Sequence, residues 1–255
     1  QSFTSGADMV QALVGGSLDI VLGSYEHVLR QQKNGLGVKA YGEIYNGVGY
    51  SLVVKNDAPY QKLEDLKGTT LAVTKVGSLS DTGLREGLKA VNIDPDKDVQ
   101  IINGGSGATM LAAIESGKAA GGMVSEPTIS QMLATGNYRV LYDPPYDFAG
   151  ITVMAKTDWV EKNEDAMKRF LQVSNEVNER VQKDPASAVE AMLQEFDQIP
   201  ADVMETAVKN QLAKVPAGLK VTEEGAKNVS KTQIEAGVLE KEIPFEDTVD
   251  LSLLP

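Results

Sequence analysis

The chain has 255 residues and a formal net charge of −12, from 36 acidic and 24 basic side chains. This charge repels phosphate backbones and anionic lipid, so nucleic acid is not expected as a partner. The sequence contains no cysteine, which excludes disulfides, thiolate nucleophiles and thiolate metal sites. No apolar run approaches the roughly 20 residues of a membrane-spanning helix, so none is predicted.

The sequence repeats itself with an offset of 101 positions. Residues 5–57 align without a gap with residues 106–158. Identical pairs include Met9 with Met110 and Gly16 with Gly117, and many apolar positions exchange conservatively. An internal repeat of this length predicts two copies of one structural unit.

Each copy has the pattern of alternating helices and strands. In the first copy, the spacing of apolar residues predicts a helix that ends at Gly16, a strand over 18–23, a helix that ends near Gly35 and a strand over 38–44. The second copy repeats this order, with strands over 119–124 and 138–143. Alternation of this kind favours parallel α/β sheets.

A further strand, helix and strand precede the second copy, over 70–74, 78–91 and 99–103. Shifted back by 101 positions, this unit would fall before Gln1. We therefore expect that roughly 30 residues of the first domain are not in this sequence.

The matched segments 50–55 and 151–156 close the two copies. We expect them to be adjacent strands that cross between two domains, one over 1–52 and 150–255 and the other over 53–149. From Glu161 the pattern is helical, and these helices are expected to cover the first domain. The predicted fold class is α/β, with two similar α/β domains joined by two crossing strands, a hinge between them and a helical C-terminal region.

Two stretches resemble a known family. Residues 63–74, LEDLKGTTLAVT, resemble the entry to the second domain of type 2 periplasmic binding proteins. Residues 111–127, LAAIESGKAAGGMVSEP, resemble the helix, strand and Glu-Pro turn of the substrate-binding proteins of nitrate, sulfonate, taurine and thiamin-precursor ABC importers.

The resemblance implies a small-molecule ligand bound between the two domains, closure on binding, and delivery to an ABC transporter permease. It also implies a location in the periplasm or on the outer face of the cytoplasmic membrane, where a preceding segment can carry a lipid anchor. A monomer without a cofactor is expected. In this family, a strand and loop that lie before the residues present here touch the ligand, so part of the site has no counterpart in this sequence.

Ligands of α/β sheets bind beyond the carboxyl ends of the strands, where helix amino termini supply unpaired N–H groups. Four turns of this sequence fit that position. They predict ligand contacts from Ser24, Tyr25, Tyr50, Thr74, Lys75, Ser78, Ser106, Ser125 and Glu126. Three plain alternatives stay open: Ser78 caps its helix, Glu126 braces its own loop, and the glycines around Ser106 serve a tight turn.

The class of ligand is also open at this point. Lys75 and the serines suit a sulfonate, nitrate or carboxylate, whereas Tyr25, Tyr50 and Glu126 suit a neutral compound such as a pyrimidine. The single histidine, His27, is expected to be a packing or surface residue, and without cysteine no catalytic triad or zinc site can be assembled. The chain is therefore not expected to be an enzyme. The alternatives are a ligand-sensing domain of the same fold and, less favoured, a relative of the thiamin-pyrimidine synthases.

Overall fold

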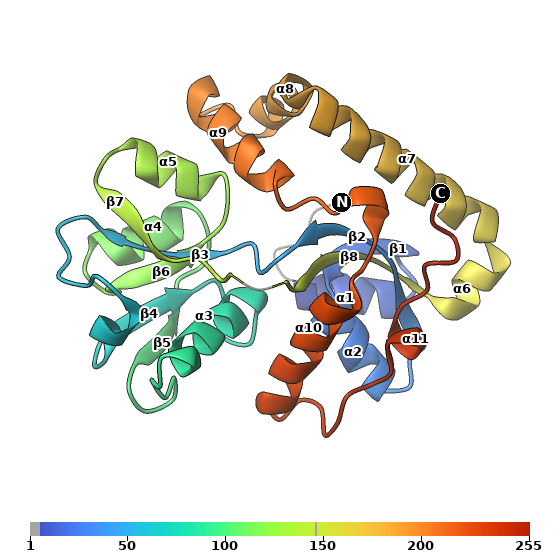
Figure 1. Ribbon diagram of the computed structural model, residues 1–255, viewed down its shortest axis with the longest axis horizontal. Coiled ribbons are helices and arrows are strands. Elements are labelled where there is room, and N and C mark those ends of the chain that lie inside the picture. The colour runs from blue at the N-terminus through green and yellow to red at the C-terminus, as the bar shows by residue number, and fades with distance from the viewer. Residues whose placement is uncertain (1–5, 146) are drawn as a thin grey trace. The chain divides into compact units, whose positions relative to one another are not determined.

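A computed structural model of the protein describes residues 6–145 and 147–255 (Figure 1). The chain divides into two compact units. Unit 1 comprises Gln1–Gly47, Tyr146–Asp184 and Leu212–Pro255, and unit 2 comprises Val48–Pro145 and Pro185–Gln211. Residues 185–211, which the sequence placed in the first domain with the rest of 150–255, thus group with unit 2.

The two copies of the repeat contain the same elements in the same order. The first copy contains α1 (Gly6–Val14), β1 (Ile20–Ser24), α2 (Glu26–Lys33), β2 (Val38–Asn46) and β3 (Ser51–Lys55). The second contains α4 (Ala108–Glu115), β6 (Gly121–Val124), α5 (Thr128–Ala134), β7 (Tyr138–Tyr142) and β8 (Ala149–Lys156). This order confirms the predicted pattern, except that Ser5 lies outside the described residues.

The remaining elements also follow the prediction. Before the second copy lie η1 (Leu63–Leu66), β4 (Thr70–Val73), α3 (Leu79–Ala90) and β5 (Gln100–Asn103). After it the chain is helical, with α6 (Thr157–Lys162), α7 (Glu164–Lys183), α8 (Pro185–Glu195), α9 (Ala201–Leu212), η2 (Ala217–Leu219), α10 (Glu223–Glu235) and α11 (Phe245–Thr248). The fold is therefore mixed α/β, as predicted.

The last strand of each copy lies in the sheet of the other copy. The sheet of unit 1 has the order β1-β8-β2, and the sheet of unit 2 has the order β5-β4-β6-β3-β7 (Figure 1). Strands β8 and β3 run antiparallel to both of their neighbours. The prediction that 50–55 and 151–156 lie beside each other is therefore wrong, because each is an inner strand of a different sheet.

The strand exchange keeps the register of the repeat. Gly23 lies opposite Thr152 in unit 1, and their repeat counterparts Val124 and Ser51 lie opposite each other in unit 2. Each sheet therefore combines two strands of one copy with one strand of the other, and neither copy completes a sheet with its own residues alone.

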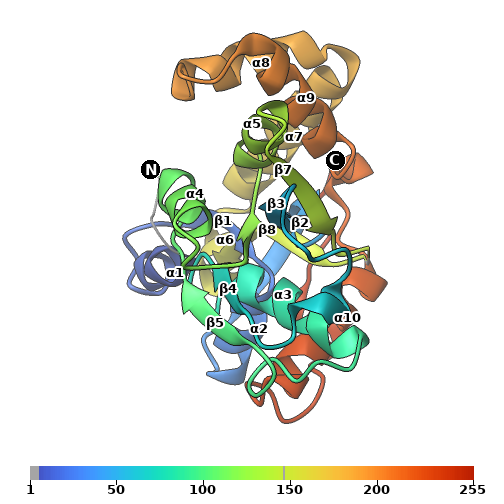
Figure 2. The same cartoon turned by 90° about the vertical axis from the view of Figure 1, so that its left-hand side faces the viewer.

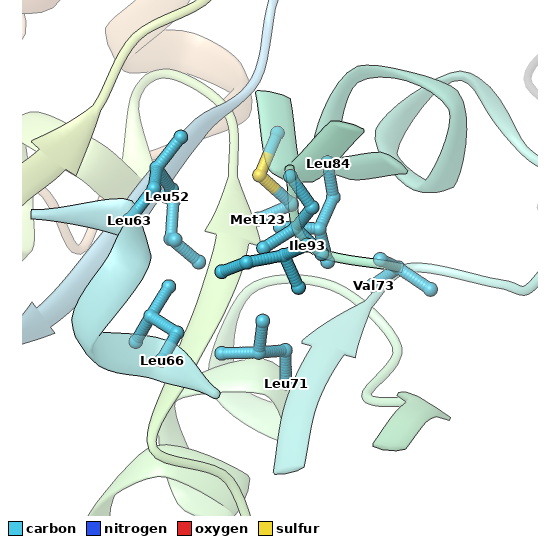
Figure 3. Close-up of a cluster of buried hydrophobic side chains, with 9 residues drawn as sticks. Leu52, Leu63, Leu66, Leu71, Val73, Leu84, Ile93 and Met123 are labelled. Atoms are coloured by element: carbon cyan, nitrogen blue, oxygen red, sulfur yellow. The ribbon is translucent and has the colours of Figure 1, made fainter. Parts of the chain in front are cut away.

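Buried side chains cover both faces of the unit 2 sheet. One cluster packs under α3 and η1 and includes Leu52, Leu71, Val73 and Leu84 (Figure 3). The opposite face packs against α4 and α5 through a second cluster that contains Val53 and the fully buried Ala72. Neighbouring residues of one strand thus belong to different clusters, as the two-residue period of a strand requires. Helices accordingly lie on both sides of this sheet (Figure 2).

In unit 1 the strands pack against α6, α7 and η2 through a third cluster of Tyr41, Val153, Ala155, Val160, Met167, Leu171 and Leu219. No helix of the described residues combines the length and the apolar content that a bilayer crossing requires.

Candidate functional site

The strands of unit 2 present their carboxyl ends at one edge of the sheet. Strand β4 is parallel to β5 and β6, so the residues that follow these three strands lie at the same edge. Strand β3 is antiparallel to β6 and therefore begins at this edge. The structure therefore brings together seven predicted site residues at what we call the unit 2 edge, namely Tyr50, Thr74, Lys75, Ser78, Ser106, Ser125 and Glu126.

Three hydroxyl groups form a closed cluster at this edge. The Thr74 Oγ1 atom lies 3.0 Å from Ser78 Oγ and 2.8 Å from Ser80 Oγ, and the two serine oxygens are 2.9 Å apart. The Tyr50 hydroxyl joins the cluster through a hydrogen bond with the Thr74 side chain. Burial raises the pKa of this hydroxyl, and the hydrogen bond with Thr74 partly offsets the rise. Ser78 occupies the cap position of α3, yet its hydroxyl accepts no bond from a helix amide. The capping alternative for Ser78 thus does not describe its side chain.

The backbone amides of the loop after β4 are already engaged within unit 2. Val76 N donates to Asn103 Oδ1 at 2.7 Å, and Gly77 N donates to Asp81 Oδ2 at 2.7 Å. Asp81 is 3% exposed, and its other oxygen accepts from Arg85 Nε at 2.8 Å. An anion at this edge is therefore not held by these two amides, and side chains must supply its contacts.

Lys75 is the side chain that meets this requirement. It is exposed, and no carboxylate of the described residues lies within ion-pair distance of its ammonium group. Several other lysines of unit 2 are paired, such as Lys67 with Asp98 at 2.9 Å. The unit 2 edge thus combines an available positive charge with a hydroxyl cluster, which suits a ligand that carries an oxyanion.

The Glu126 carboxylate is engaged inside unit 2. Its Oε2 atom accepts from Ser130 N at 3.0 Å, and its Oε1 atom accepts from Ser130 Oγ at 3.0 Å and from Asn210 Nδ2 at 2.8 Å. It therefore braces the first turn of α5 and joins α9 to it, which is the alternative that the sequence left open. Nearby, Ser125 is half-buried and Ser106 is exposed.

In unit 1, strand β1 ends at Ser24 and Tyr25 follows it. Ser24 is 7% exposed, and its Oγ atom has no hydrogen-bond partner among the described residues. Tyr25 is 1% exposed, its hydroxyl lies 2.5 Å from Thr248 Oγ1, and burial raises its pKa to about 12. Tyr25 is thus a core residue, whereas Ser24 retains an unused polar group.

His27 packs inside unit 1, as expected for a lone imidazole. A Cβ atom at Gly6 would clash with His27 Nε2, so the ring lies against the first residue of α1. Burial lowers the pKa of His27 to about 4, with a smaller contribution from the positive charge of Arg30. The ring is therefore neutral at neutral pH.

Sequence reasoning missed Glu43, which is completely buried in β2. Its Oε1 atom accepts from Gly150 N at 3.1 Å, and its Oε2 atom has no partner among the described residues. Burial raises the pKa of Glu43 to about 8, and the nearby Asp147 carboxylate raises it further against the hydrogen bonds that lower it. The signal that could have found it is an acidic residue within the apolar strand of residues 38–44.

A pocket of about 710 Å³ lies at the other edge of the unit 1 sheet, near the start of β2 and the end of β8. Its lining comprises Gln32, Lys33, Gly37, Lys39, Thr157, Leu239, Glu240, Lys241, Ile243 and Asp247. Two of its lysines fasten the C-terminal segment, since Lys33 Nζ donates to Val238 O at 2.5 Å and Lys39 Nζ donates to Glu246 O at 2.7 Å. None of the predicted site residues lines this pocket.

Comparison with known sequences gives two matches. The profile of the family described as "NMT1/THI5 like" matches residues 2–188. The protein named "Putative binding protein YtlA" of Bacillus subtilis (strain 168) is 25% identical over 258 residues, which covers 96% of this chain and 76% of that protein.

Solved structures with the same fold include two periplasmic binding proteins. The periplasmic aliphatic sulphonate binding protein SsuA from Escherichia coli has a TM-score of 0.79 at 22% identity, over 96% of this chain and 84% of that one. The periplasmic nitrate-binding protein NrtA from Synechocystis PCC 6803 has a TM-score of 0.72 at 18% identity, over 98% of this chain and 77% of that one. The chain therefore has the periplasmic binding protein fold.

Proposed function

The chain belongs to the NMT1/THI5-like family, and from this membership we propose that it is the extracytoplasmic solute-binding protein of an ABC importer. It captures a small organic solute and delivers it to a membrane permease, and it performs no catalysis. The fold shared with the sulphonate-binding protein SsuA and the nitrate-binding protein NrtA supports this function. The expectation that the solute lies between the two domains stays a prediction.

We further propose that the solute carries an oxyanion, such as a sulfonate, nitrate or carboxylate. The observation that carries this choice is Lys75, an exposed cation without an ion-pair partner among the described residues, next to the hydroxyl cluster of Thr74, Ser78 and Ser80. A positive charge with hydroxyl donors beside it favours bound negative charge. In unit 1, the unpartnered Ser24 Oγ is proposed as an additional donor.

A neutral pyrimidine was the competing ligand class, and the geometry does not favour it. Two of the three residues that suited it are engaged elsewhere, because the Tyr25 hydroxyl bonds to Thr248 and the Glu126 carboxylate bonds to Ser130 and Asn210, whereas Tyr50 stays at the unit 2 edge. An amine or amide donor on a ligand would have to compete with these bonds.

The test begins with the solute itself, identified by mass spectrometry after denaturation of the purified protein. Titration calorimetry with that solute then compares the wild type with Lys75→Ala. A charge-assisted hydrogen bond contributes about 1.5–3 kcal/mol, so we expect a ten- to hundredfold loss of affinity.

The matched control is Lys118→Ala. Lys118 is also an exposed lysine of unit 2, but it precedes β6 and so lies at the opposite edge of the sheet. The Lys118→Ala substitution removes the same charge as Lys75→Ala, and we expect it to leave the affinity for the solute unchanged. Equal affinity for Lys75→Ala and the wild type would remove the oxyanion assignment.

A further inference from the structure

Glu43 occupies an unusual place in the unit 1 sheet. Its strand, β2, departs from regular pairing with β8 on both sides of it, between Ala40 and Gly42 and between Glu43 and Tyr45. The side chain is completely buried, and only one carboxyl oxygen has a partner, the N–H of Gly150. A buried carboxyl with one unpaired oxygen is costly in its charged form, because burial removes that oxygen from bulk solvent and no hydrogen bond replaces the solvation.

The groups around Glu43 link three elements. Asp147, in the turn that leads into β8, is the charged group that faces it, and the Asn46 side chain of β2 donates a hydrogen bond to Asp147 Oδ1. The hydroxyl of Thr222, which caps α10, donates to Asp147 Oδ2 at 2.8 Å. On β8, Thr152 lies opposite Glu43 and donates to Gly23 O at 3.3 Å.

This network lies beside two points where the chain passes from one unit to the other. These points follow Gly47 and Pro145. The Gly47 N–H donates to Phe148 O at 2.7 Å, so the end of β2 and the turn of residues 147–149 are hydrogen-bonded to each other. The turn that carries Asp147 is thus bonded to the end of β2, next to the segments that connect the units.

We propose that Glu43 is a pH-sensitive switch that holds the turn of residues 147–149 on β2 while its carboxyl is protonated and loosens it when the proton leaves. Loss of the proton places a second negative charge beside Asp147 and leaves Oε2 to be hydrated. Both effects favour a displaced turn.

The sign of the pH effect follows from the raised pKa. The folded protein keeps the proton up to about pH 8, whereas the unfolded chain loses it near pH 4.5. Between these values the folded state binds more protons, so stability falls as the pH rises. The effect of this switch on solute affinity rests on the proposed function, whereas the switch itself does not.

The first experiment measures chemical unfolding of the wild type and Glu43→Gln at pH 6 and pH 8. The glutamine imitates the protonated carboxyl. We expect the folding equilibrium constant of the wild type to fall by roughly ten- to a hundredfold more than that of the variant between these two pH values. Because His27 is present in both proteins, its titration cancels in the comparison. The same pH dependence in both proteins would overturn the proposal.

A second experiment remains informative if Glu43→Gln does not fold. Asp147→Asn removes the facing charge, so we expect its stability to fall less steeply than that of the wild type as the pH rises toward 8. Hydrogen exchange of the Gly47 amide, corrected for intrinsic rates, should accelerate in the wild type from pH 6 to pH 9. An Asp147→Asn protein with the wild-type pH dependence, or an unchanged corrected Gly47 rate, would contradict the switch.

The consequence for transport is measured separately, by calorimetry with the identified solute at pH 6 and pH 9. We expect the wild type to lose affinity at the higher pH and Glu43→Gln to keep it. A protein that binds no solute at either pH would contradict the proposed function and leave the stability experiments to decide the switch.

Discussion

The turns Ser24-Tyr25 and Ser125-Glu126 occupy the same position in the two copies of the repeat, yet their side chains have different partners. Tyr25 bonds to Thr248 of α11, and Glu126 bonds to Asn210 of α9. In both units, the residue after the serine thus fastens a helix of the C-terminal region, which has no counterpart in the repeat. The repeat therefore determines the path of the backbone, whereas the side chains of each copy form bonds with the particular helix that packs on it.

The serines of the two turns also differ. The Ser24 hydroxyl is buried and has no partner among the described residues, while Ser125 is half-buried at the unit 2 edge. The proposed site residues of unit 2 are thus half-buried or exposed, whereas Ser24 and Tyr25 of unit 1 are buried.

The largest expected effect comes from substitutions in the exchanged strands β3 and β8. Leu52 of β3 and Val153 of β8 are repeat counterparts, and both are completely buried. Leu52→Ala should lower the free energy of unfolding by about 2–5 kcal/mol, and Val153→Ala by less because fewer carbon atoms are lost. Hydrogen exchange should show the loss of protection in β4 and β6 for Leu52→Ala, and in β1 and β2 for Val153→Ala. The same pattern of lost protection in both variants would show that the two sheets do not respond separately.

The next effect concerns His27 of unit 1. Its folded pKa of about 4 lies below the ordinary value of 6.5, so below pH 6.5 the unfolded chain binds a proton that the folded protein does not. Stability should therefore fall as the pH drops from 6.5 to 4, by up to about 3 kcal/mol. Chemical unfolding at pH 4.5 and pH 7 measures this, with His27→Gln as the control. A control that loses as much stability as the wild type would assign the effect to other groups.

The smallest expected effects come from substitutions in the turns Ser24-Tyr25 and Ser125-Glu126. Tyr25→Phe removes the bond to Thr248, and Glu126→Gln weakens the bonds to Ser130 and Asn210. Each should lower the free energy of unfolding by about 1 kcal/mol, because a typical buried hydrogen bond contributes that much. Calorimetry should show wild-type solute affinity for both, since both side chains are engaged within their own units. A tenfold loss of affinity in either variant would return that residue to the binding site.

The order of elements was predictable because it depends on local signals. Glycines at 16 and 117 have positive φ angles of 77° and 73° and end their helices, and the apolar periods between such stops identify helices and strands. The edge at which Thr74 and Ser125 lie was also predictable, because parallel strands share an edge.

Long-range partners were not predictable from the sequence. Nothing local indicates that β3 pairs with β6 and β7, or that Tyr25 meets Thr248, which lies 223 positions further along the chain. The role of Glu126 was open for the same reason, since its partner Asn210 is distant in sequence. Glu43 was missed because its burial depends on strand pairing with β8.

We propose that the solute binds at the unit 2 edge, where the strands of that sheet end. This proposal is tested most directly by hydrogen exchange of the wild type with and without the solute identified by mass spectrometry. We predict solute-dependent protection in residues 74–80 and 124–130, and unchanged exchange in 33–39 and 239–247, which line the pocket at the opposite edge of unit 1. Protection confined to 33–39 and 239–247, with none in 74–80, would contradict it.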